Sequence, residues 1–225
     1  KIVWKRTNPA VNELYRKRLT GEAYAIRGIH KFFLLRNHAG IGKNGQLLGI
    51  PIYNKFLENQ EDFSTPRATF EESVSSVYAD FTEALKYLPL DYGNISSLDN
   101  LPPGFTDITD VNHYNAVFGD MSRQRICGRY VKAFMGRMAL LAASPAFNLT
   151  NNQALWESAA QYNGELLVDA GGISGLDPNG HLFYLKAQVD ATRLNSGDNL
   201  DLKEILWRRP IYSDRVREQD NFPPS

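Results

Sequence analysis

The feature that most constrains the fold is an apolar stripe of helical period between residues 69 and 89. Its members recur every three or four residues: Val74, Val77, Tyr78, Phe81, Leu85 and Leu88. This spacing places all of them on one face of an α-helix, and that face must be buried against another element. Thr69 and Glu72 form a capping-box pattern before the stripe, and Pro89 ends it. The stripe therefore predicts a helix packed against a hydrophobic core.

A longer helical signal covers residues 11–38. Asn8-Pro9 supplies a cap residue and a first-turn proline, and Gly40 supplies a residue that can adopt positive φ after the last turn. Gly21 weakens this helix near its middle, which predicts either a close packing contact or a break there.

Two more helices are expected after residue 125. The first, residues 125–144, has a bulky face and a face of small residues that lets a neighbouring helix approach closely. The bulky face holds Val131, Phe134, Met135, Met138 and Leu141, and the small face holds Ala133, Gly136, Ala139 and Ala143. The second starts near Asn152 and runs to Gly171-Gly172, a left-handed cap. Because antiparallel pairs are the economical packing for such stripes, we predict an all-α fold.

Long loops separate these helices. Residues 40–66 are rich in glycine, and residues 47–63 are a candidate site, because long loops are uncommon unless they carry a function. The alternative is that their aromatic residues only pin the loop to the core. Residues 90–125 are expected to contain no regular element, and residues 204–209 to form a short extended segment.

The balance of charge excludes one class of function. The chain has 225 residues, with 25 basic and 25 acidic side chains, and proteins that bind nucleic acid through phosphates usually show a basic excess. The charges are nevertheless segregated: residues 1–40 carry nine Lys or Arg against two acids, residues 57–110 carry two against eleven, and residues 111–149 carry five against one. Such blocks usually form solvated faces, and they leave room for charged surfaces toward a transporter or membrane.

Few residues suggest catalysis or a cofactor. The four histidines lack metal-ligand spacing, no phosphate loop or nucleophile elbow is present, and no run of residues is apolar and long enough to cross a membrane. Cys127 is the only cysteine, which excludes an intrachain disulfide. Arg125 and Arg129 could lower the pKa of its thiol, although a lone cysteine at a helix start is more often structural. We therefore predict no cofactor, no metal and no enzyme activity.

Aromatic and amide side chains in the predicted loops are the chemistry of a binding surface, because rings stack on sugars and amides bond hydroxyl groups. The candidate ligand-binding residues are Trp4, Tyr53, Asn54, Phe56, Trp207 and Tyr212. Tyr92 and Tyr114 belong to the same group of aromatic loop residues.

Two resemblances narrow the class. Phe81, Ala84 and Pro89 fall at the offsets of the second helix of a tetratricopeptide repeat, although no 34-residue period is visible. Five groups of residues along roughly residues 15–170 resemble the SusD/RagB family of outer-membrane nutrient-binding lipoproteins. They are GEAYAIRG (21–28) with FFLLR (32–36), PRAT (66–69) with LKYLP (85–89), GRYVKA (128–133), AASPAFN (142–148) and WESAA (156–160).

The resemblance implies a tetratricopeptide-like α-α superhelix with long loop insertions. It also implies a lipid-anchored protein at the surface of a Bacteroidota-type cell, with a SusC-like TonB-dependent transporter as partner. The family's ligand residues follow no motif, so no binding residue is carried over. The chain is expected to be one domain over residues 1–225, a piece of a longer protein, with a helical core at about 9–170 and a loop-rich part at 171–225.

Four functions follow in order of preference. The first is non-catalytic binding of oligosaccharides and their delivery to the transporter. The second is peptide binding in another branch of the same family. The others are a tetratricopeptide-type interaction scaffold and an α-helical glycoside hydrolase.

Overall fold

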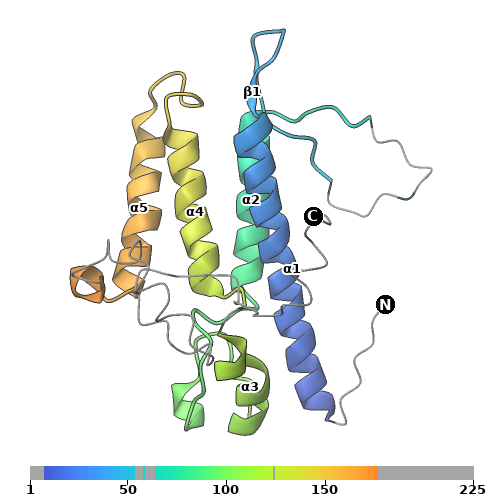
Figure 1. Ribbon diagram of the computed structural model, residues 1–225, viewed down its shortest axis with the longest axis vertical. Coiled ribbons are helices and arrows are strands. Elements are labelled where there is room, and N and C mark those ends of the chain that lie inside the picture. Colours follow the sequence, from blue (N-terminus) through green and yellow to red (C-terminus); the bar gives the residue numbers. More distant parts are fainter. Residues whose placement is uncertain (1–7, 54–57, 59–63, 124, 177–225) are drawn as a thin grey trace, which may run out of the picture.

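The computed structural model describes residues 8–53, 58, 64–123 and 125–176. Within them, four long helices form two antiparallel pairs (Figure 1). The helices are α1 (Pro9–His38), α2 (Phe70–Leu85), α4 (Gly128–Ala143) and α5 (Gln153–Asp169). α1 packs along α2, α4 packs along α5, and contacts between α2 and α4 join the pairs. The predicted all-α fold is confirmed.

The expected caps at the starts of α1 and α2 are confirmed, and α1 ends at His38 as expected. Asn8 Oδ1 accepts hydrogen bonds from the amides of the first turn of α1, and Thr69 and Glu72 form the capping box of α2. α1 does not end in a left-handed glycine: Ala39 is extended, with φ −69° and ψ 152°. Gly40 instead enters a two-residue strand, because the chain continues directly into a hairpin.

The hairpin lies in a segment where no regular element was expected before about residue 50. β1 (Gly40–Ile41) pairs antiparallel with β2 (Leu47–Leu48). The positive φ considered for Gly40 occurs instead at Gly45, at 78°, in the turn between the strands. The hairpin lies at the end of the molecule opposite to α3 (Figure 1).

Glycines allow α1 and α2 to approach closely. A methyl group at Gly21 would lie 2.7 Å from Leu88 Cγ, and one at Gly28 would lie 2.6 Å from Phe81 Cε1. Because α1 is continuous across both positions, Gly21 marks a packing contact and not a break. Of the two alternatives drawn from the sequence, the close contact is confirmed.

The segment at 90–125 contains regular structure that sequence reasoning missed. α3 (Val111–Phe118) is capped by Asp110, and the 3₁₀ turns η1 (Leu98–Asn100) and η2 (Asp120–Ser122) flank it. α3 buries Tyr114, Val117 and Phe118 beside Phe105 and packs against the first half of α1. Eight residues with three core contacts are too short to show a helical period.

The two faces predicted for the third long helix are confirmed in α4. The bulky residues Val131, Phe134 and Met138 are buried in the main core. The small residues Ala139 and Ala143 pack against Ala159 of α5. After α5 the expected left-handed glycine is present, since Gly171 has φ 94°, and the 3₁₀ turn η3 (Gly172–Gly175) follows.

The extended segment expected at residues 204–209 lies outside the described residues. Within the described part of the chain, no helix combines the length and apolarity needed to cross a bilayer.

Candidate functional site

Of the six candidate ligand-binding residues, the structure describes only Tyr53. Trp4, Asn54, Phe56, Trp207 and Tyr212 lie outside the described residues. Tyr53 is half-buried and directly follows Ile52, which lines a pocket between α1 and α2. Residues 47–63 are the loop that the sequence identified as a candidate site. Its described residue Ile52 therefore lies at a pocket.

Two of the other aromatic residues assigned to a binding surface are core residues. Tyr92 is 6% exposed and Tyr114 is 1% exposed. The Tyr92 hydroxyl donates to the carbonyl of Ile126 at 3.0 Å, and burial raises its pKa. Burial likewise raises the pKa of Tyr114 to about 12. Their interpretation as surface residues is wrong, because the segment at 90–125 packs into the main hydrophobic core.

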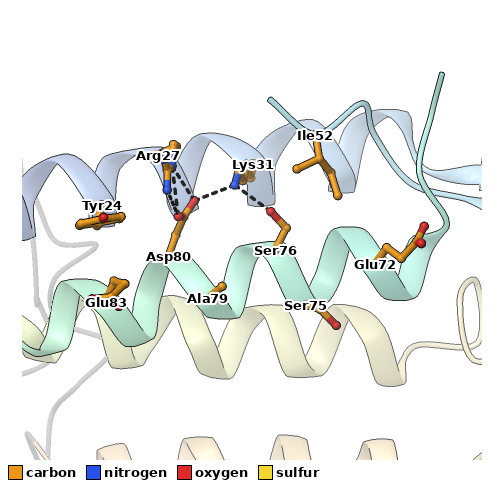
Figure 2. A pocket seen from close by; sticks show the side chains of 10 residues that line it. All are labelled: Tyr24, Arg27, Lys31, Ile52, Glu72, Ser75, Ser76, Ala79, Asp80 and Glu83. Carbon is orange, nitrogen blue, oxygen red and sulfur yellow. Dashed lines mark hydrogen bonds and ion pairs between the residues drawn. The ribbon is translucent and has the colours of Figure 1, made fainter. Parts of the chain in front are cut away.

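The α1–α2 pocket has a volume of about 450 Å³, which is within the range of small-molecule sites. Figure 2 shows Tyr24 and Glu83 at one end, Ile52 and Glu72 at the other, and the charged residues of α1 and α2 between them. The lining residues are Tyr24, Arg27, Lys31, Ile52, Glu72, Ser75, Ser76, Ala79, Asp80 and Glu83.

A buried carboxylate organises the middle of this pocket. Arg27 of α1 donates from Nε to both oxygens of Asp80, at 3.0 and 3.1 Å, and also from Nη2. Lys31 Nζ lies 2.9 Å from Asp80 Oδ2 and donates to Ser76 Oγ at 2.8 Å. The hydrogen bond to Asp80 raises the pKa of Arg27. The side chains of Asp80 and Lys31 are only 4% and 8% exposed, so this is a buried ion pair that ties α1 to α2.

The charges around the pocket nearly balance. Two cations, Arg27 and Lys31, face three carboxylates, Asp80, Glu72 and Glu83, and Glu83 also pairs with Lys86 outside the pocket. A balanced mixture of donors and acceptors beside an aromatic ring suits a neutral ligand with many hydroxyl groups better than an ion.

None of these pocket residues was identified from the sequence except Ile52, which lies in the candidate loop at residues 47–63. The signal that could have found them is a pair of polar stripes: Tyr24, Arg27 and Lys31 follow one face of α1, and Ser76, Asp80 and Glu83 follow one face of α2. A buried Lys31 and a buried Asp80 on helices that pack together must face one another to avoid an unpaired charge.

A second pocket, of about 410 Å³, lies where α2, α4 and α5 meet near the hairpin. Its walls are mainly apolar, with Leu47, Val74 and Leu155 around the stacked rings of Phe70 and Phe147, whose centroids are 4.5 Å apart. Its polar residues Thr69 and Asn152 already cap α2 and α5. It therefore offers fewer directed polar groups than the α1–α2 pocket.

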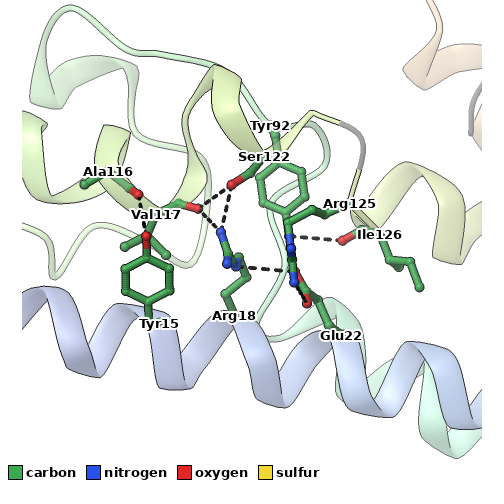
Figure 3. A network of polar contacts seen from close by, with 9 residues as sticks. All are labelled: Tyr15, Arg18, Glu22, Tyr92, Ala116, Val117, Ser122, Arg125 and Ile126. Atoms are coloured by element: carbon green, nitrogen blue, oxygen red, sulfur yellow. Dashed lines mark hydrogen bonds and ion pairs between the residues drawn. The ribbon is translucent and has the colours of Figure 1, made fainter. Parts of the chain in front are cut away.

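Another cluster of buried charges has a structural role. Figure 3 shows Arg18 and Glu22 of α1 reaching the segment around α3. Arg18 donates to the carbonyl of Val117 at 2.6 Å and to Ser122 Oγ at 2.7 Å, and Glu22 accepts two hydrogen bonds from Arg125 at 2.7 and 2.8 Å. Burial lowers the pKa of Arg18. These contacts fix the long connection between α2 and α4 onto α1.

Cys127 has the environment of a structural thiol. It is buried at the N-terminus of α4, and burial raises its pKa to about 12. Burial outweighs the opposite effect of Arg129 on the thiol, and both neighbouring arginines are paired with acids, Arg125 with Glu22 and Arg129 with Asp91. The lowered pKa considered from the sequence is wrong. Among the described residues, no group of His, Cys, Asp and Glu is arranged to hold a metal ion.

We expect Cys127 to react with a chromogenic thiol reagent about a hundredfold more slowly in the folded chain than in denaturant.

Burial of Cys127 also makes the free energy of unfolding depend on pH. The folded thiol ionises at about 12 and the unfolded thiol near 9.0, so the unfolded state loses its proton first. The free energy of unfolding should therefore fall between about pH 9 and 12 by more in the natural chain than in Cys127→Ala, with no difference below pH 8. Equal alkaline losses in both proteins would refute this.

No protein-family model matches the chain, and no significant match exists among curated proteins. The chain is similar to one SusD-like structure. That structure is a SusD-like carbohydrate binding protein from Bacteroides vulgatus ATCC 8482, with a TM-score of 0.47 and 22% identity. The match covers 85% of this chain and 30% of the other, so this chain spans less than a third of that protein.

Proposed function

We propose that the chain is part of a non-catalytic SusD/RagB-like protein that binds glycans, and that the α1–α2 pocket is one of its glycan subsites. The proposal is supported by the five groups of family-like residues and by the paired helices in or next to which they lie. The observation that carries it is the pocket itself, in which nearly balanced charges surround a polar floor beside the ring of Tyr24.

The lining offers the contacts that a sugar requires. Arg27 is 39% exposed and uses Nε and Nη2 on Asp80, which leaves Nη1 to donate to a hydroxyl group. Glu83 is 37% exposed and can accept from neighbouring hydroxyl groups. The half-buried ring of Tyr24 supplies the apolar contact. Because Asp80 holds Arg27 in place, these groups are oriented before a ligand arrives.

We also propose that the longer protein is a lipoprotein at the outer-membrane surface and delivers its ligand to a SusC-like TonB-dependent transporter. Both parts of this proposal rest on the family resemblance. Co-purification of the full-length protein with a TonB-dependent transporter from its native membrane would support them, and recovery of the protein without such a partner would count against them.

Isothermal titration calorimetry with a panel of neutral oligosaccharides tests the pocket. We expect Glu83→Gln and Tyr24→Ala each to weaken binding of the best ligand by about tenfold, because each removes one direct contact worth about 1.4 kcal/mol. The matched control is Glu157→Gln on the exposed surface of α5, which should leave the affinity unchanged. Binding that is insensitive to both pocket variants would remove the pocket from the proposal.

Other experimental results would favour one of the three alternative functions. Binding to peptides with no response to any glycan would favour the peptide-binding branch. No small-molecule binding, together with capture of a protein partner, would favour an interaction scaffold. Release of sugars from a polysaccharide would identify a glycoside hydrolase.

A further inference from the structure

Two arginines differ from all others in the described part of the chain. Six arginines there are paired with carboxylates: Arg16, Arg18, Arg27, Arg123, Arg125 and Arg129. Arg67 donates to the carbonyls of His38, Leu48 and Gly49. Among the described residues, Arg36, Arg67 and Arg137 make no ion pair, and of these three only Arg67 donates to backbone carbonyls. Arg36 Nε donates to Asn37 Oδ1 at 3.5 Å. Most N–H donors of Arg36 and Arg137 are therefore left for another molecule.

Both of these arginines lie over the same aromatic ring, although one comes from α1 and the other from α4. Arg36 is 5.0 Å and Arg137 is 6.0 Å from the centroid of Phe33. Arg137 also lies 5.0 Å from the Phe134 ring and 5.3 Å from the Phe32 ring. A guanidinium over a ring keeps its N–H donors in its own plane, where they can engage a carboxylate with two hydrogen bonds.

Exposed apolar side chains accompany the two arginines. Ile26 lies two turns before Phe33 on α1 and is 44% exposed, and Leu140 lies beside Arg137 on α4 and is 52% exposed. Trp156 of α5 is 37% exposed. It lies two turns before Asn163, whose Nδ2 donates to the carbonyl of Gly136 on the antiparallel α4, and Leu140 lies one turn after Gly136. Trp156 and Leu140 therefore lie toward the same end of the helix pair.

We propose that this surface, here called the Arg36–Arg137 face, binds an acidic segment of a partner protein in which carboxylates alternate with apolar side chains. Charge complementarity identifies the occupant. No acidic residue occurs in α4, and the acids of α1, Glu13 and Glu22, are already paired with arginines. α5 carries Glu157, Glu165 and Asp169, so the carboxylates of the segment are expected over α1 and α4, and only its apolar side chains near Trp156. The apolar neighbours favour a peptide over a purely polar anion, because arginine and aromatic residues beside aliphatic ones are typical of protein interfaces.

Fluorescence anisotropy with a labelled synthetic peptide tests this proposal on the whole 225-residue chain. The probe is an amphipathic twelve-residue peptide of glutamate and leucine, and its partner probe has glutamine in place of every glutamate. We expect the acidic peptide to bind, with an affinity that falls as salt is raised, and Arg137→Gln and Arg36→Gln each to weaken it by about tenfold. Arg16→Gln is the matched control, because it removes an exposed arginine that is paired with Glu13.

Each outcome decides the matter. Equal binding of the acidic and the glutamine peptides, or no loss in either arginine variant, would overturn the proposal. Displacement of the peptide by oligogalacturonate, with tighter binding of the sugar than of the peptide, would replace it with an anionic-glycan site. Arg137→Lys adds a further readout: it keeps the charge, so it should restore part of the salt-sensitive binding without the bidentate contact. Unchanged circular dichroism will show that these exposed substitutions leave the fold intact.

Discussion

Asp80→Ala is expected to lower the free energy of unfolding by about 3–5 kcal/mol, because it removes the carboxylate that a buried lysine and an arginine both contact. Lys31 is 8% exposed and its Nζ lies 2.9 Å from the Asp80 carboxylate. Arg27 loses its partner in the same substitution, but it is 39% exposed and can turn toward water. Urea denaturation followed by circular dichroism measures the change.

Two further variants test whether the buried charge causes the loss of stability in Asp80→Ala. Glu13→Ala removes a carboxylate that also pairs with an arginine, but Glu13 is 62% and its partner Arg16 is 75% exposed, so the expected loss is below about 1 kcal/mol. The double variant Asp80→Leu with Lys31→Met removes both charges and should recover most of the stability lost in Asp80→Ala. If the double variant is less stable than Asp80→Ala, the cluster stabilises the helix pair by something other than mutual neutralisation.

The long helices could be predicted from the sequence because their apolar stripes are long and their caps are explicit. Thr69 with Glu72 and Asn8 with Pro9 placed two helix starts correctly. α3 could not be predicted in the same way, because eight residues contain too few turns to reveal a period. The end of α1 at His38 was predicted correctly, but Gly40 does not adopt positive φ, because glycine permits that conformation without requiring it.

The candidate site was less predictable, for a different physical reason. The pocket brings Tyr24, Arg27 and Lys31 of α1 together with Asp80 of α2, about 50 residues later in the sequence. The periodicity of one helix does not determine its register against another helix. Gly28 lets the α1 backbone approach Phe81, and we expect this contact to fix that register. A glycine within a helix, next to a stripe of charged residues, is a signal that the sequence contains but that periodicity alone does not interpret.

Phe81→Ala is expected to lower the free energy of unfolding by about 3–5 kcal/mol, since it opens a cavity where α1, α2 and α4 meet. Phe81 is fully buried, and its ring centroid is 6.4 Å from that of Phe134 on α4. Phe147→Ala is a suitable comparison, because Phe147 is only partly buried and lines a surface pocket with Phe70. Its loss should be clearly smaller in the same denaturation experiment.

The same variant tests whether Gly28 fixes the packing of the two helices. In the natural chain, Gly28→Ala places a methyl group 2.6 Å from Phe81 Cε1 and should destabilise the fold by about 1–3 kcal/mol. In the Phe81→Ala background the ring is absent, so the substitution should become neutral or stabilising by up to about 1 kcal/mol, the helix preference of alanine over glycine. Gly164→Ala on α5, where an added methyl group meets nothing within 4 Å, should stabilise both backgrounds equally. An unchanged cost of Gly28→Ala in the two backgrounds would mean that the Phe81 ring is not what limits the approach of α1 to α2.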